Sequence, residues 1–183
     1  MKKDAIRNLT LSAMFLAIGF VLPFLTGQIQ PFGMMLLPMH IPVLLCALIC
    51  GWKYGLAVGL ILPVLRSATL GMPPMIPMAV SMSLEMATYG LILGLMYMFY
   101  QKKTSLGFFP VIYLSLIKAM LIGRAVWGIA MFLLLSARGG MFTFQAFIAG
   151  AFVNAVPGII LQLVLIPAVM IALDKAGLIK FRK

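Results

Sequence analysis

The chain has 183 residues, of which 64% are hydrophobic and 9% are charged, and its formal net charge is +11. This composition excludes a water-soluble fold and favours an all-α integral membrane protein, with residues 1–183 forming a single membrane domain. The positive charge does not indicate nucleic-acid binding, because the basic residues are not interleaved with surface aromatic side chains.

The lysine and arginine residues are distributed unevenly, and this distribution predicts a membrane topology. Six long apolar stretches cover most of the chain. Ten of the 14 basic residues lie at the two ends or in alternate connections: Lys2, Lys3, Arg7, Lys53, Lys102, Lys103, Lys175, Lys180, Arg182 and Lys183. Basic residues are retained on the cytoplasmic side of a membrane. We therefore expect a six-transmembrane-helix bundle with cytoplasmic N- and C-termini, and Arg138 is the clear exception to the pattern.

The first three spans are predicted in the N-terminal half. The first runs from about Leu9 to Leu25, and we interpret it as an uncleaved span because no small-x-small cleavage site follows it. The second, from about His40 to Cys50, is too short to cross the bilayer unless the segment from Met34 to Pro38 is partly inserted. The third runs from about Leu56 to Leu70, with a kink expected at Pro63.

The last three spans are longer. The fourth covers roughly Met78 to Tyr100, and the fifth runs from about Phe108 to Ser136. The sixth extends from about Phe142 to Leu173, and its first part could lie along the membrane surface. The remaining residues form a basic tail that we place in the cytoplasm.

Polar and charged side chains interrupt these spans. A charge within hydrocarbon costs at least about 2.5–3.5 kcal/mol and usually faces the bundle interior. The interruptions are His40, Arg66, Glu85, Lys118, Arg124, Asn154 and Gln162. Most of them lie in the outer half of the predicted bundle, which indicates a pocket filled from outside rather than a continuous pore. Tyr89 shares a helix face with Glu85, and Trp127 shares one with Arg124.

Two interpretations of these residues stay open. As a ligand site, the outer set contains Arg66 and Arg124 against Glu85, an excess of one positive charge that an anionic ligand would balance. As structural features, Glu85 would pair with Arg124, Arg66 would extend to the outer interface, and the other polar residues would link or pack helices. On the first interpretation, the candidate substrate-binding residues are His40, Arg66, Glu85, Tyr89, Arg124, Trp127 and Asn154.

Small residues recur at helical spacing. Ala13 and Ala17 lie on one face of the first span, and such spacing lets another helix approach closely. Two pairs of glycines repeat the spacing further along, where we expect packing within the bundle: Gly55 with Gly59, and Gly90 with Gly94.

The sequence contains no recognisable catalytic set. It has no HExxH, GxSxG or Walker motif, so we expect a protein that is not an enzyme, with no catalytic residue and no phosphate-binding loop of its own. Cys46 and Cys50 are spaced i, i+4 without other potential metal ligands, which favours a packing role over a metal site. No cofactor is expected in this chain, and any ATP must be hydrolysed by a partner.

The architecture and three segments together resemble the substrate-binding S components of energy-coupling factor (ECF) vitamin transporters. The resemblance covers nearly the whole chain and is carried by six apolar spans, by Ala13 and Ala17 in the first of them, and by the stretches from Leu37 to Leu45 and from Leu62 to Ser67. It implies a multi-pass protein of a bacterial plasma membrane. It also implies a transmembrane coupling subunit, contacted through the two alanines, and two ATPase subunits.

The resemblance further implies a vitamin or vitamin-precursor site near the outer face. Pantothenate is the substrate we favour. Its carboxylate would balance the excess positive charge, and its hydroxyl and amide groups would form hydrogen bonds with Asn154, Tyr89 and Glu85. A pyridoxine-type vitamin is an alternative, in which Glu85 would bind a cationic ring. A structural membrane subunit with interhelical ion pairs and no ligand is the other alternative.

Overall fold

The computed structural model describes residues 2–26, 35–103 and 107–178, and within these ranges the regular elements are all helical. Met34 of the expected inserted segment lies outside the described residues, as do Lys180, Arg182 and Lys183 of the basic tail. The elements in chain order are α1 (Lys2–Thr26), α3 (His40–Ile49), α4 (Trp52–Leu70), the π-helical turn η1 (Met75–Ala79), α5 (Val80–Lys103), α6 (Phe108–Ser136), α7 (Phe144–Ile148), the π-helical turn η2 (Ala149–Val153) and α8 (Val156–Lys175).

The prediction of an all-helical membrane protein is confirmed. Five segments of the described chain are long and apolar enough to cross a membrane: Lys3–Leu25, Trp52–Leu70, Met75–Lys102, Phe108–Ser136 and Phe144–Lys175. Large apolar side chains such as Leu9, Leu121 and Ile129 are exposed on their surfaces. Exposed apolar area of this extent is suited to contact with lipid.

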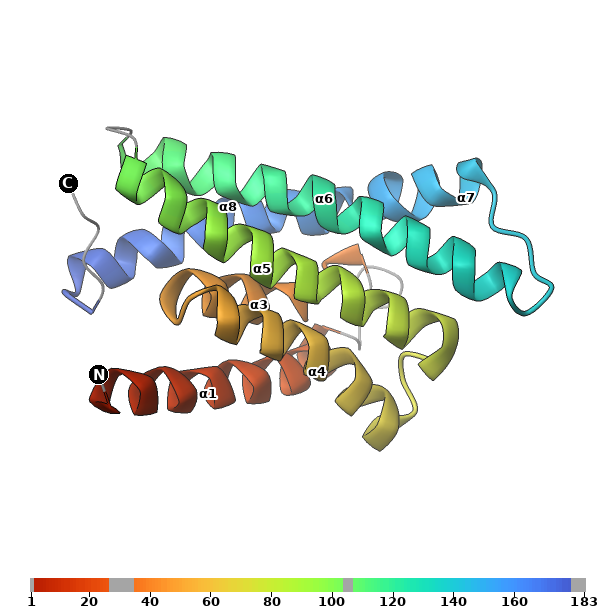
Figure 1. The fold of residues 1–183 in the computed structure, drawn as a ribbon, viewed down its shortest axis with the longest axis horizontal. Helices are drawn as coiled ribbons and strands as arrows, with labels where there is room; N and C mark the ends of the chain where they lie inside the picture. Colours follow the sequence, from red (N-terminus) through yellow and green to blue (C-terminus); the bar gives the residue numbers. More distant parts are fainter. Residues whose placement is uncertain (1, 27–34, 104–106, 179–183) are drawn as a thin grey trace.

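The second predicted span differs from the others. Helix α3 has 10 residues, which is about 15 Å of helix against a hydrocarbon core of about 30 Å. The number of spanning helices therefore stays a prediction, as does the cytoplasmic position of the termini. The N-terminal end of α1 and the C-terminal end of α8 do lie at the same end of the bundle, on the left of Figure 1.

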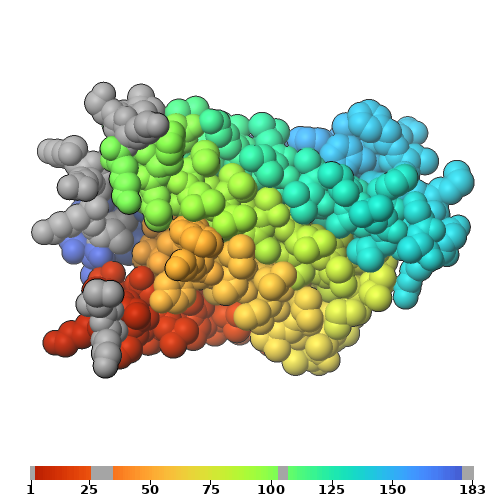
Figure 2. Space-filling model, in the orientation of Figure 1, coloured from red at the N-terminus to blue at the C-terminus, as the bar shows by residue number. Residues whose placement is uncertain are grey.

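Helix α5 occupies the middle of the bundle, between α4 on one side and α6 on the other (Figure 1). In the space-filling view these three helices form a closely packed face, with α7 at one end (Figure 2). Helix α1 packs on α3 and α4, and α8 packs on α3 and α6. A core of buried side chains joins α3, α5, α6 and α8, and includes Leu44, Tyr89, Leu116 and Ile166.

Glycines set the close approach of α4 and α5, as their spacing predicts. A Cβ on Gly90 would overlap the backbone of Gly55, and a Cβ on Gly94 would lie 2.6 Å from Cα of Trp52. On Gly59, a Cβ would overlap the backbone of Met86. The α4–α5 pair is therefore held at a separation that no larger residue allows at these positions.

Replacing Gly90 with alanine should destabilise the protein by roughly 1–3 kcal/mol, because the added methyl group must push α4 and α5 apart. Thermal unfolding of the detergent-solubilised protein measures this as a lower Tm. Gly140→Ala is the control, since the nearest heavy atom to the added Cβ, the carbonyl oxygen of Leu135, lies 3.4 Å away at ordinary contact distance. Equal Tm values for the two variants would contradict the packing role of Gly90.

The last predicted span is not one continuous helix. The chain forms α7, then η2, and then breaks at Asn154 and Ala155 before α8 begins. The break has a local cause, because Pro157 lies in the first turn of α8 and lacks the N–H that a continuous helix would require. Asn154, a candidate site residue, therefore lies at this break and not within a continuous helix.

Candidate binding site

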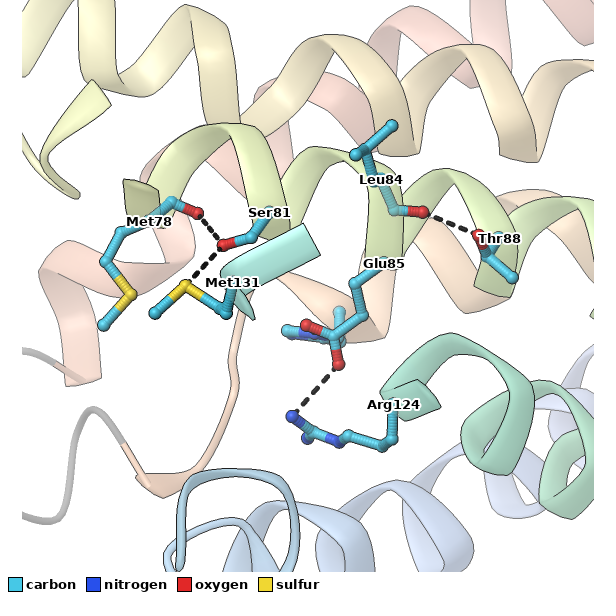
Figure 3. A network of polar contacts seen from close by, with 8 residues as sticks. Met78, Ser81, Leu84, Glu85, Thr88, Arg124 and Met131 are labelled. Atoms are coloured by element: carbon cyan, nitrogen blue, oxygen red, sulfur yellow. Dashed lines mark hydrogen bonds and ion pairs between the residues drawn. The ribbon is translucent and has the colours of Figure 1, made fainter. Parts of the chain in front are cut away.

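A buried ion pair joins α5 to α6. Arg124 Nη1 lies 3.0 Å from Glu85 Oε1, and the two side chains are 6% and 2% exposed. Figure 3 shows the two side chains pointing toward each other from their helices. Burying either charge alone would cost several kcal/mol of desolvation free energy, and the attraction between the two charges offsets this cost.

His40 approaches the same carboxylate from α3. Its Nε2 atom lies 3.8 Å from Glu85 Oε2, and the histidine is 1% exposed. Its ring centroid is 5.4 Å from that of Tyr89, which is buried one helical turn after Glu85 on α5. Three helices thus bring His40, Glu85 and Arg124 together, and we call these three residues the polar cluster.

The polar cluster is rich in atoms without partners. Seven buried side-chain nitrogen or oxygen atoms of the described residues have no hydrogen-bond partner; besides Asn8 Oδ1, they are both ring nitrogens of His40, Glu85 Oε1, Nε and Nη2 of Arg124, and Gln162 Nε2. The contact of Glu85 with Arg124 is therefore an ion pair without a well-directed hydrogen bond. Buried polar atoms are nearly always paired in folded proteins. Their concentration here indicates a site that is incomplete without a ligand.

Gln162 was not among the predicted site residues, although it is the second polar interruption of the last span. It is 1% exposed on α8. The available signal was its position: glutamine in an apolar span is rare enough to require a partner. Asn154 is also a polar residue in this apolar span, so the sequence did not show which of the two faces the interior. The helix break before α8 distinguishes them, because it leaves Asn154 exposed.

Arg66 does not join the polar cluster. Its Nη1 donates to the carbonyl oxygen of Phe20 at 2.6 Å, and its guanidinium lies 4.8 Å from the ring centroid of Phe24. Arg66 thus links α4 to the end of α1. The charge count changes as a result, because the remaining buried pair, Glu85 with Arg124, is balanced and has no excess positive charge.

Asn154 and Trp127 also lie outside the polar cluster. Asn154 is exposed at the helix break. Trp127 is buried in an aromatic group, stacked on Phe147 at a centroid distance of 6.4 Å and edge-on to Phe142 at 5.9 Å. This aromatic group packs the α7–η2 segment against α6.

A hydrogen-bonded segment lies beside the polar cluster on α5. Ser81, one turn before Glu85, donates to the carbonyl oxygen of Met78 at 3.0 Å and contacts Met131 Sδ of α6 at 3.2 Å (Figure 3). Arg138, just beyond α6, donates to the carbonyl oxygen of Ile76 at 3.3 Å. These contacts tie η1 and the start of α5 to the neighbouring end of α6.

Ala13 and Ala17 lie on an exposed face of α1. The opposite face is the buried one: Cys46 Sγ contacts Ser12 Oγ at 3.6 Å, and a Cβ on Gly19 would meet the Leu62 side chain of α4 at 2.5 Å. The two alanines are therefore free to contact lipid or another protein. Cys46 is buried as a free thiol, as is Cys50.

An apolar groove lies apart from the polar cluster. It has a volume of about 330 Å³ and is bounded by α1, residues 36–45 and α8, with Phe15, Ile41 and Leu161 among its lining residues. The lining residues that the structure describes are all apolar. A water-soluble ligand would lose hydrogen bonds there, so the groove does not compete with the polar cluster as a site for one.

Comparison with known proteins gives one match. The family described as "ECF transporter, substrate-specific component" matches residues 7–170. This range includes the whole polar cluster and most of each helix that contributes to it. No curated protein and no solved structure matches the chain.

Proposed function

Since this chain belongs to the family of substrate-specific components of ECF transporters, we propose that it binds a small vitamin or vitamin precursor at the polar cluster. Members of this family are multi-pass membrane proteins and substrate-binding subunits, not enzymes. They work with a transmembrane coupling subunit and with ATPases. We place this chain in the plasma membrane of a bacterium, with the substrate entering from the extracellular side.

The observation that carries the proposal is the set of unpartnered atoms on a buried ion pair. A pair that served only to hold α5 and α6 together would direct its N–H groups at the carboxylate. Arg124 instead directs only Nη1 at Glu85, and its Nε and Nη2 atoms have no hydrogen-bond partner among the residues that the structure describes. These two N–H groups share one edge of the guanidinium, the geometry that binds a carboxylate through two parallel hydrogen bonds.

Pantothenate is the substrate we favour. Its carboxylate fits the free edge of Arg124, and its hydroxyl and amide groups offer partners to Glu85 and Tyr89. The free edge of Arg124 is now the reason to expect an anionic ligand. The earlier reason, an excess of one positive charge, required Arg66 at the site, and Arg66 instead contacts Phe20 of α1. His40 lies 3.8 Å from Glu85, and its ring nitrogens, which have no hydrogen-bond partner among the described residues, offer further polar contacts to the ligand.

A pyridoxine-type vitamin is the second candidate, and Glu85 is the residue that favours it. Its Oε1 atom accepts no hydrogen bond from the described residues. A ligand with a protonated ring nitrogen would donate to this oxygen. In that arrangement the free edge of Arg124 would meet a ring hydroxyl.

A ligand panel separates these candidates. Purified protein in detergent is titrated with pantothenate, with its neutral alcohol analogue and with pyridoxine, and binding is measured by calorimetry and by the shift in Tm. We expect one pantothenate per chain, no requirement for ATP, and much weaker binding of the alcohol. Equal binding of the acid and the alcohol would overturn the carboxylate assignment. Binding of none of the three would overturn the proposed substrates.

A further inference from the structure

Gln162 lies at the same level of the bundle as the polar cluster. Helices α3 and α8 both run toward the end that holds the termini (Figure 1). Gly158, one turn before Gln162, faces residues 35–37: a Cβ on it would lie 2.6 Å from the carbonyl oxygen of Met35. Leu161 and Leu165, next to Gln162 and one turn on along α8, line the apolar groove together with Ile41 and Leu45 of α3. Gln162 is thus level with the first turn of α3, where His40 lies.

The direction of the side chain follows from its helix face. Gly158, Gln162, Ile166 and Met170 repeat every four residues, and all four are buried. Leu161 and Leu165, on the neighbouring face, line the apolar groove with Ile41 and Pro42. The amide of Gln162 therefore faces the bundle interior rather than lipid.

Its amide nitrogen is unsatisfied. Gln162 is 1% exposed, and its Nε2 atom has no hydrogen-bond partner within residues 2–26, 35–103 and 107–178. An interhelical link would appear as a hydrogen bond from this atom to a neighbouring helix. A buried primary amide without such a bond reduces stability, so its presence is better explained by a partner that arrives with the ligand.

We infer that Gln162 is a ligand-binding residue that selects for a hydrogen-bond acceptor, a hydroxyl or carbonyl oxygen, at the α8 side of the site. The inference rests on the proposed function of the polar cluster. Arg124 would hold the anionic end of the ligand, and Gln162 would distinguish ligands with an oxygen acceptor elsewhere in the molecule from acids without one. In this role Gln162 takes the place that the sequence assigned to Asn154.

The test is Gln162→Leu, which removes the amide and keeps a similar volume. Pantothenate affinity should fall roughly 10- to 100-fold, the effect of leaving a ligand acceptor unpaired. Without ligand, Tm should stay equal to wild type or rise, because the substitution removes an unsatisfied buried group. Gln162→Met, an unbranched side chain of similar length, repeats the test if leucine does not pack. Gln101→Leu, at the far end of α5, is the matched control and should leave both quantities unchanged.

The opposite pattern would overturn the inference. A lower Tm with unchanged affinity would identify Gln162 as a structural amide, and unchanged affinity alone would exclude it from the ligand site. Wild-type protein that fails to bind pantothenate would instead overturn the proposed substrate. In that case the Tm of Gln162→Leu is still informative. A Tm below that of the wild type would show that the amide stabilises the unliganded bundle, and would overturn the inference for Gln162 as well.

Discussion

Replacing Arg124 with lysine should weaken pantothenate binding by roughly 30- to 150-fold, from the loss of charge-assisted hydrogen bonds worth about 2–3 kcal/mol. Lysine keeps a positive charge opposite Glu85, so the buried pair survives. It does not keep the Nε and Nη2 groups, for which the described part of the chain offers no hydrogen-bond partner. The substitution therefore separates ligand binding from the stability of the bundle.

Calorimetry with pantothenate, alongside Tm of the unliganded protein, measures the two effects. Arg66→Lys is the matched control, because Arg66 is tied to Phe20 and Phe24 of α1 rather than to the polar cluster. We expect Arg66→Lys to bind pantothenate as the wild type does. If both variants lose affinity equally, or neither does, Arg124 is not the residue that holds the carboxylate.

Arg124→Met should lower the stability of the unliganded protein, in contrast to Arg124→Lys, which should mainly lower ligand affinity. This variant leaves the Glu85 carboxylate buried at 2% exposure without a cation. Breaking a buried pair in this way costs about 3–5 kcal/mol. A large fall in Tm for methionine and a small one for lysine would show that the same arginine has two separable roles, one toward Glu85 and one toward the ligand.

The sequence was sufficient to predict that Glu85 could meet Arg124, because charge in an apolar span has few permitted positions. Glu85 and Arg124 could be placed at similar depth from 1.5 Å of rise per residue, and their helices are continuous where they meet. His40 followed from its place at the start of the second span. To predict that these residues lie at a similar level, it was enough to know the depth of each one along its own helix.

Rotation and helix breaks were not predictable in the same way. Arg66 has a long side chain near the end of α4, and it reaches the carbonyl oxygen of Phe20 on α1 instead of turning inward. Asn154 was predicted as a site residue on the assumption of a continuous last span, and at the break before α8 it is exposed. Gln162 lies within the unbroken part of α8 and is buried there.

Replacing Ala13 and Ala17 together with leucine should reduce substrate uptake at least about tenfold while leaving pantothenate affinity unchanged. Both alanines lie on the exposed face of α1, turned away from Ser12 and Gly19. Small residues at this spacing allow two helices to approach closely, and leucine would hold them apart. We propose that the coupling subunit packs on this face, so the double variant should also fail to co-purify with it.

Uptake of labelled pantothenate into cells that express the complete transporter measures the effect, and co-purification reports on assembly. Ala125→Leu is the control, because Ala125 lies on the exposed stripe of α6 between Leu121 and Ile129. The same added bulk there should leave uptake unchanged if α6 faces lipid. Normal uptake by the double variant would place the coupling subunit on another face of the bundle, and an equal loss from Ala125→Leu would show that added bulk alone impairs the transporter.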